Sequence, residues 1–211
     1  MLRSEEIADR LEKGDTEEIP DPLVVVPMPD LKDLESRGSV SLDLRLGSWF
    51  VALRQARMSH LDIDIEQRQR QQLSKTSYVP FGSKFFLHPR NFVLGTTLEW
   101  IRLPRDLGGY VVGKSSWGRR GLVIATATSV HPGFAGCITL ELTNVGEIPI
   151  AISPGMAICQ LCLHQTLGNA PDVDQSQFVG LRKPSLGRIQ PDAVAKALSK
   201  AYGGENHDTA Q

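Results

Sequence analysis

The sequence has almost no net charge, no long apolar run and few cysteines. Its 23 basic and 24 acidic side chains give a net charge of −1, so no overall field attracts nucleic acid or an acidic membrane surface. No segment approaches the ~20 apolar residues of a membrane-spanning helix, and the first 14 residues have the pattern of an amphipathic helix instead of a signal peptide. Three cysteines, an odd number, fit a reducing compartment. We expect a cytoplasmic protein that binds neither nucleic acid nor membranes.

The sequence predicts one short helix near each end. Ser4 can cap the first helix, which we expect to end at Gly14. The last helix, within residues 191–202, has Pro191 near its start and a glycine after its end. No internal repeat or second domain is visible. We therefore expect one domain over residues 1–190, followed by an appended helix and a polar tail over residues 191–211.

Between these helices the chain is typical of a mainly β fold. The segment 39–53 alternates as a half-buried strand does. Its opposing faces carry three leucines and a charged pair: Leu42, Leu44 and Leu46 against Asp43 and Arg45. Residues 62–76 are the most polar run and are expected to be a surface excursion. Beyond them, short apolar runs recur about every ten residues, separated by Gly, Pro and Asn, which is the spacing of a barrel or sandwich.

The segment GGYVVGKS, residues 108–115, matches the phosphate-loop pattern G-x-x-x-x-G-K-[ST]. The context argues against a P-loop NTPase, because Tyr110–Val112 favour a strand and Gly118 and Gly121 would interrupt the long helix that must follow. Local anion binding remains open, with an exposed basic turn as the alternative. The cluster of cations and hydroxyls that raises this possibility comprises Lys114, Ser115, Ser116, Arg119 and Arg120.

Six segments follow one another in a fixed order over residues 41 to 161. They are SLDLRLG (41–47), FFLHP (85–89), LGTTLEWIRLP (94–104), GKSSWGRRGL (113–122), ATATSVHPGFAGCITLELTN (125–144) and PIAISPGMAICQL (149–161). Together they resemble dCTP deaminases, which belong to the trimeric dUTPase superfamily. The resemblance implies a dUTPase-like distorted β-barrel of the jelly-roll type. It also implies a hydrolase of a cyclic amidine C–N bond, which converts dCTP into dUTP and ammonia in pyrimidine deoxynucleotide metabolism.

The resemblance also implies roles for individual residues. Glu141 would shuttle protons, Ser115 and Arg119 would surround the water and the base, and the carbonyl of Ala127 would help hold the water. The implied nucleotide contacts are Lys114, Ser116, Thr126, His131, Phe134, Gln160, Phe178, Arg182 and Lys183. For Phe134, Gln160, Arg182 and Lys183, ordinary core packing or solvation is the alternative. We expect Mg²⁺ to arrive with the triphosphate, and a homotrimer in which the GKSS turn of one chain meets Glu141 of another.

The residues favour deamination without zinc. Zinc deaminases carry H-x-E and P-C-x-x-C signatures, whereas Cys159 and Cys162 form the only C-x-x-C here and no H-x-E accompanies them. Residues three apart in a strand point to opposite faces, so we expect core cysteines. In the strand 138–144, Glu141 shares a face with two threonines opposite the leucines, and a burial-raised pKa would suit proton exchange. A glutamate on a solvated face is the alternative.

Three departures from the family pattern leave other functions open. His131 stands where relatives usually carry an aspartate, the segment between Leu122 and Thr126 is one residue shorter, and Gln177 and Leu181 replace a lysine and a glutamine. The alternatives are a dUTP pyrophosphatase, a bifunctional deaminase and pyrophosphatase, or a nucleotide-binding regulator without activity. Pyrophosphatases normally need an aspartate to activate water, and His131 at the best candidate position counts against them.

Overall fold

The computed structural model describes residues 1–15, 20–53, 74–125, 129–168, 179–187 and 193–202. Its helices are α1 (Ser4–Asp15), α2 (Leu31–Ser36), α4 (Ser115–Gly118) and α5 (Ala193–Tyr202). Its strands are β1 (Val24–Val26), β2 (Leu42–Arg45), β3 (Trp49–Leu53), β4 (Ser74–Tyr78), β5 (Phe85–Leu87), β6 (Phe92–Arg102), β7 (Leu107–Gly113), β8 (Leu122–Ile124), β9 (Ser129–Val130), β10 (Ala135–Asn144), β11 (Ile150–Ile152) and β12 (Ala157–Gln165). No described helix is both long and apolar enough to cross a membrane.

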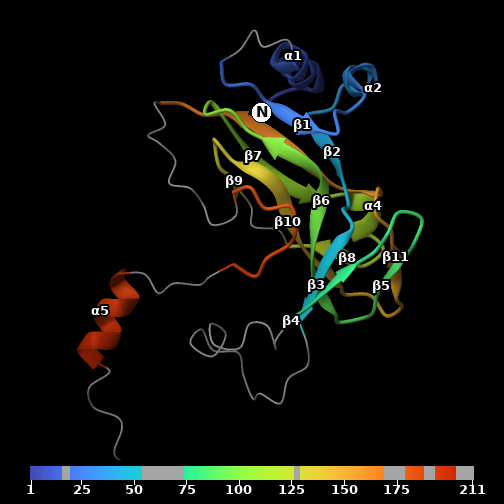
Figure 1. Cartoon of the computed structure of the whole chain (residues 1–211), viewed down its shortest axis with the longest axis vertical. Coiled ribbons are helices and arrows are strands. Elements are labelled where there is room, and N and C mark those ends of the chain that lie inside the picture. Colours follow the sequence, from blue (N-terminus) through green and yellow to red (C-terminus); the bar gives the residue numbers. More distant parts are fainter. Residues whose placement is uncertain (16–19, 54–73, 126–128, 169–178, 188–192, 203–211) are drawn as a thin grey trace, which may run out of the picture.

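The strands form three antiparallel sheets around one core (Figure 1). The order β4-β3-β6-β10-β8, with β1 beside β6, makes a six-stranded sheet, and β2-β12-β7-β9 makes a four-stranded one. Strands β5 and β11 pair separately. An isolated bridge from Leu46 to Thr97 connects the end of β2 to β6. The predicted mainly β architecture, with a helix near each end, is confirmed.

Alternation along the strands places the polar side chains on their outer faces. In β2, Leu42 and Leu44 are buried while Asp43 and Arg45 are half-buried, as predicted. In β10, Leu140 and Leu142 are buried, and the residues on the other face, including Glu141, are half-buried. The buried leucines anchor both strands in the common core, so their polar neighbours are held at fixed positions on the surface.

The N-terminal helix is present, but the predicted cap is wrong. The first helical hydrogen bond runs from the Ile7 amide to the Arg3 carbonyl, so the helix starts one residue before a Ser4 cap would allow. The Ser4 hydroxyl is buried without a partner in the described part of the chain. At the other end, a Cβ on Gly14 would lie 2.8 Å from Pro22 Cβ, so the returning chain requires a glycine there.

Three further segments bear on the sequence predictions. Asp30 caps the short helix α2, which the sequence analysis did not predict, by accepting hydrogen bonds from the Lys32 and Asp33 amides at 3.0 and 3.2 Å. Most of the predicted polar excursion falls within residues 54–73, which lie outside the described residues, and its last residues belong to β4. Helix α5 occupies the predicted C-terminal position and lies away from the sheets in Figure 1.

Candidate functional site

The GGYVVGKS segment is a strand followed by a turn. Tyr110–Val112 lie in β7 and pair with β12. Helix α4 then ends after one turn at Gly118, and Gly121 has a positive φ of 88°. Lys114 occupies the N-cap position with extended backbone, and its amide donates to the Ile158 carbonyl at 3.1 Å. This geometry confirms that the segment is not a P-loop, which needs a long helix directed at the phosphates.

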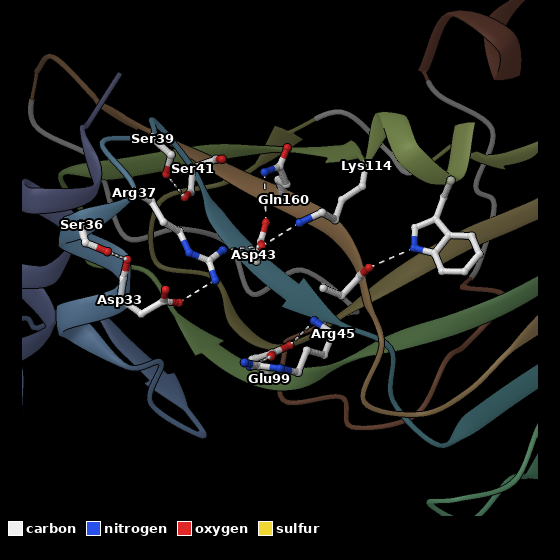
Figure 2. A network of polar contacts seen from close by, with 12 residues as sticks. Asp33, Ser36, Arg37, Ser39, Ser41, Asp43, Arg45, Glu99, Lys114 and Gln160 are labelled. Atoms are coloured by element: carbon white, nitrogen blue, oxygen red, sulfur yellow. Dashed lines mark hydrogen bonds and ion pairs between the residues drawn. The ribbon is translucent and has the colours of Figure 1, made fainter. Parts of the chain in front are cut away.

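Lys114 and Gln160 converge on Asp43, as Figure 2 shows. The Lys114 Nζ lies 2.7 Å from Asp43 Oδ2, and Gln160 Nε2 donates to Oδ1 at 3.0 Å. Arg37 Nη1 donates to Oδ2 at 2.8 Å, and its Nη2 pairs with Asp33. The sequence analysis placed Asp43 on the polar face of a strand but did not assign it to the site.

The Asp43 carboxyl has a pKa below its ordinary value. Burial alone would raise that pKa, but the hydrogen bonds from Lys114 and Gln160, the charge of Lys114 and the hydrogen bond from Arg37 together outweigh it. Asp43 is therefore a carboxylate at neutral pH, and it neutralises part of the basic turn that begins at Lys114.

Trp117 anchors the rest of the turn to the core, and the polar side chains of the turn point toward solvent. The Trp117 indole donates to the Ala157 carbonyl at 3.1 Å, and its ring packs against the core. Ser115 and Arg119 are exposed, and neither side chain has a hydrogen-bond or ion-pair partner among the described residues. The carbonyl of Ser116 accepts from Arg120 Nη1 at 2.6 Å. The turn thus presents two hydroxyls and one guanidinium that remain available for a ligand.

Glu141 lies on the outer face of β10, between β6 and β8. Its backbone pairs with Leu94, and its carbonyl accepts from the Ala125 amide at 2.9 Å. The half-buried carboxylate has no hydrogen-bond or ion-pair partner in the part of the chain that the structure describes. Thr126 and Ala127 follow directly in the sequence but lie outside the described residues. The predicted separation of Glu141 from the leucine face is confirmed.

The turn before β10 carries His131 and Phe134. The Phe134 amide donates to the His131 carbonyl at 3.1 Å. His131 is exposed, whereas Phe134 is partly buried and packs against the core. Phe134 therefore has at least the packing role that the sequence analysis left open.

Residues 180 and 181 of the tail lie beside the start of β10. The Gly180 amide donates to the Ala135 carbonyl at 2.6 Å, and the Cys137 amide donates to the Leu181 carbonyl at 2.8 Å. Arg182 lines a cavity of about 500 Å³ that also contacts Trp49, Tyr78, Trp100 and Cys137. The Lys183 ammonium lies 3.9 Å from the centroid of the Trp49 ring. Neither tail cation contacts Lys114 or Gln160 among the described residues, and Phe178 is outside them.

The cysteines of the C-x-x-C pattern are separated by the alternation of β12. Cys159 is fully buried, and burial raises its thiol pKa to about 12. Cys162 is half-buried, and burial also raises its pKa. The described residues contain no group of three or more His, Cys, Asp or Glu side chains that could hold a metal ion. The prediction of a core position is confirmed for Cys159.

Next to the site, the buried Glu99 forms an ion pair with the more exposed Arg45. Glu99 is 1% exposed and accepts from the Arg45 amide at 2.8 Å and from Arg45 Nη1 at 3.0 Å. Burial raises the pKa of Glu99, because the hydrogen bonds and charge of the more exposed Arg45 only partly compensate. This pair links β6 to the strand that carries Asp43, as Figure 2 shows.

Comparisons with known proteins converge on one family. Residues 1–166 match the family described as dCTP deaminase-like. The chain is 38% identical over 210 residues to the dCTP deaminase of Natronomonas pharaonis, and the alignment covers 97% of this chain and 99% of the relative. It is 40% identical over 166 residues to the protein of Dictyoglomus thermophilum named "dCTP deaminase, dUMP-forming", covering 78% and 80%.

The fold is also similar to a solved structure. The 2'-deoxycytidine 5'-triphosphate deaminase of Agrobacterium tumefaciens aligns with a TM-score of 0.56 and 22% identity, over 77% of this chain and 45% of that chain. At this identity the alignment supports the fold alone. Together with the strand arrangement, it confirms the predicted mainly β fold.

Proposed function

This chain belongs to the dCTP deaminase-like family, and from that premise we propose that it hydrolyses dCTP to dUTP and ammonia. The enzyme would be a hydrolase acting on a cyclic amidine C–N bond, working in the cytoplasm in pyrimidine deoxynucleotide metabolism. The observation that carries the proposal is the half-buried Glu141 carboxylate, which has no partner among the described residues of its own chain. Such a group is free to exchange protons with a substrate.

The proposed reaction adds water to C4 of cytosine. The water oxygen forms a bond to C4, and Glu141 takes one of its protons and delivers it to N3. The second water proton passes to the exocyclic nitrogen, the C4–N bond breaks, and ammonia leaves while a C4 carbonyl forms. General acid and base catalysis of this kind contributes about 10² to 10⁴ in rate. No metal is required at the reacting carbon.

The exposed turn would complete the reaction centre. Ser115 and the carbonyl of Ala127 are proposed to hold the attacking water, and the Arg119 guanidinium would stabilise negative charge that develops during attack. We propose a homotrimer in which Arg119 of one chain meets Glu141 of the next, two side chains without partners among the described residues of their own chain.

The triphosphate would bind beside this centre. Lys114, Ser116 and Gln160 are the proposed phosphate contacts, and Thr126, His131 and Phe134 would surround the nucleoside. Phe178, Arg182 and Lys183 would belong to the tail that approaches the bound nucleotide. Mg²⁺ would arrive with the nucleotide, coordinated mainly by the triphosphate and water, which is how this ion usually reaches nucleotide sites.

The test is to incubate the purified protein with dCTP, CTP or dUTP and Mg²⁺ while following ammonia and pyrophosphate. We expect ammonia from dCTP, and a loss of about 10² or more for Glu141→Gln. Glu147→Gln is the matched control, because Glu147 is an exposed carboxylate just after β10. Absence of ammonia, with dCTP still raising the melting temperature, would instead identify a nucleotide-binding regulator.

A second candidate is conversion of dCTP to dUMP, ammonia and pyrophosphate. It is favoured by relatives named "dCTP deaminase, dUMP-forming" from Parafrankia sp. and Dictyoglomus thermophilum, each 40% identical over most of this chain. The two candidates differ in their products, because only the second releases pyrophosphate in step with ammonia. Pyrophosphate from dUTP supplied alone would indicate a dUTP pyrophosphatase activity.

A further inference from the structure

We propose that Asp43 is a positioning residue that presents Lys114 and Gln160 to the triphosphate of the substrate. This inference rests on the proposed function, since it assumes that the two side chains contact phosphates. Asp43 itself would not touch the nucleotide. Its carboxylate oxygens each accept a different donor, with Lys114 Nζ at 2.7 Å from Oδ2 and Gln160 Nε2 at 3.0 Å from Oδ1.

The three residues come from neighbouring strands held in fixed register. Gln160 pairs with Asp43 on one side of β12 and with Val112 on the other. Lys114 follows directly after the end of β7. Buried leucines on either side of Asp43 fix β2 in the core. Asp43 therefore lies on a rigid element, and rigid supports are what hold functional side chains in place.

Each presented side chain keeps donors for a ligand. A lysine ammonium has three N–H groups and a glutamine amide has two, and Asp43 engages one of each. Arg37 holds Asp43 from the other side at 2.8 Å and is itself paired with Asp33. We expect the remaining N–H groups to donate to phosphate oxygens while the contacts to Asp43 persist.

Because Asp43 already holds Lys114 and Gln160, these side chains should lose less conformational entropy when a nucleotide binds. A free lysine or glutamine samples many rotamers, and immobilising it at a ligand lowers affinity. Asp43 orders both side chains before the nucleotide arrives, so its loss should weaken triphosphate binding more than chemistry. The opposing effect is repulsion between the Asp43 carboxylate and the phosphates, and the charge-neutral variant separates the two.

The experiment is a double-mutant cycle on dCTP binding and turnover. We expect Asp43→Ala to raise both the KM and the calorimetric Kd for dCTP about 10-fold, with kcat within about 2-fold. In a Lys114→Ala/Gln160→Ala background, the same change should alter them by less than about 2-fold, because nothing remains to be positioned. Asp33→Asn is the matched control, because Asp33 also pairs with Arg37 but contacts neither lysine nor glutamine.

Three results would overturn the inference. Equal effects of Asp43→Ala in both backgrounds would mean that it acts elsewhere, and a matching loss for Asp33→Asn would mean that the α2 surface is responsible. Tighter dCTP binding by Asp43→Asn would show that repulsion dominates. Failure of the proposed function is distinguishable, because it appears as absent ammonia in the unaltered protein, whereas the cycle is read from dCTP affinity. An unaltered protein without affinity for dCTP would overturn both.

Discussion

The lowered pKa of Asp43 makes the free energy of unfolding depend on pH. The unfolded carboxyl takes up a proton near pH 3.8, whereas the folded one, held by Lys114, Gln160 and Arg37, does so at lower pH. Between these values the unfolded state binds more protons, so the free energy of unfolding falls as the pH drops. The stability contributed by Asp43 is complete above pH 3.8 and is lost as the pH falls through the lowered pKa.

We therefore predict that Asp43→Asn destabilises the protein most at neutral pH. The asparagine keeps an acceptor for Gln160 but loses the charge that attracts Lys114 and Arg37, and we expect a loss of about 1 kcal/mol at pH 7. The difference from the unaltered protein should shrink below about pH 4. Urea unfolding between pH 2.5 and 7 measures both curves, and a difference that stays constant across this range would contradict the prediction.

Glu99 should give the opposite pH dependence. Its folded pKa lies above the ordinary 4.5, so the folded state binds more protons between these values and stability falls as the pH rises through them. Glu99→Gln cannot ionise, and the stability of this variant relative to the unaltered protein should increase as the pH rises from about 4.5. Urea midpoints from pH 4 to 8 test this. Curves that stay parallel across this range would contradict the raised pKa of Glu99.

At the scale of the elements, the sequence predicted what short-range periodicity determines. Alternating leucines were enough to identify β2 and the faces of β10, and strand-forming residues excluded a P-loop in β7. The Ser4 cap was predicted wrongly, because the chain path that buries Ser4 depends on a hydrogen bond to Ser39, which is distant in sequence. The residue pattern of a short segment cannot predict such long-range contacts.

The contacts of Asp43 with Lys114 and Gln160 could not be predicted either, because these residues are also distant in sequence. Asp43 and Gln160 are 117 positions apart, and Lys114 lies between them in the chain. Only the strand order β2-β12-β7 brings them together. The resemblance identified Lys114 and Gln160 as separate candidates, and the signal that could have added Asp43 was its charge on the polar face of a predicted strand.

The C-terminal helix is predicted to be separable from the barrel. Val194 and Leu198 of α5 are 67% and 53% exposed, and isolated helices shorter than about 12 residues are marginal in water. A chain that ends after Gln190 should keep the melting temperature within about 2 °C, since every described side chain of α5 is exposed. Calorimetry of the two proteins, with light scattering for oligomeric state, tests this. Dissociation of the shortened protein would show that α5 instead joins subunits.

At the scale of the whole molecule, the proposed homotrimer makes a prediction about how one site is divided between two chains. Ser115 and Arg119 are exposed on the turn after β7, and Glu141 lies on β10. None of their side chains contacts another of the three in the described residues. If each working site takes the turn from one chain and Glu141 from the next, neither Ser115→Ala nor Glu141→Gln homotrimers contain an intact site.

Mixing the two inactive chains should then restore activity. In a cyclic trimer, every mixed assembly has one boundary at which an intact turn faces an intact Glu141, so random mixing in equal amounts leaves about a quarter of all sites unaltered. We expect co-expressed Ser115→Ala and Glu141→Gln chains to release ammonia from dCTP at about a quarter of the unaltered rate. The separately purified variants, mixed without subunit exchange, provide the background. Recovery no greater than this background would mean that each chain builds its site alone, because no mixture could then combine the two intact halves.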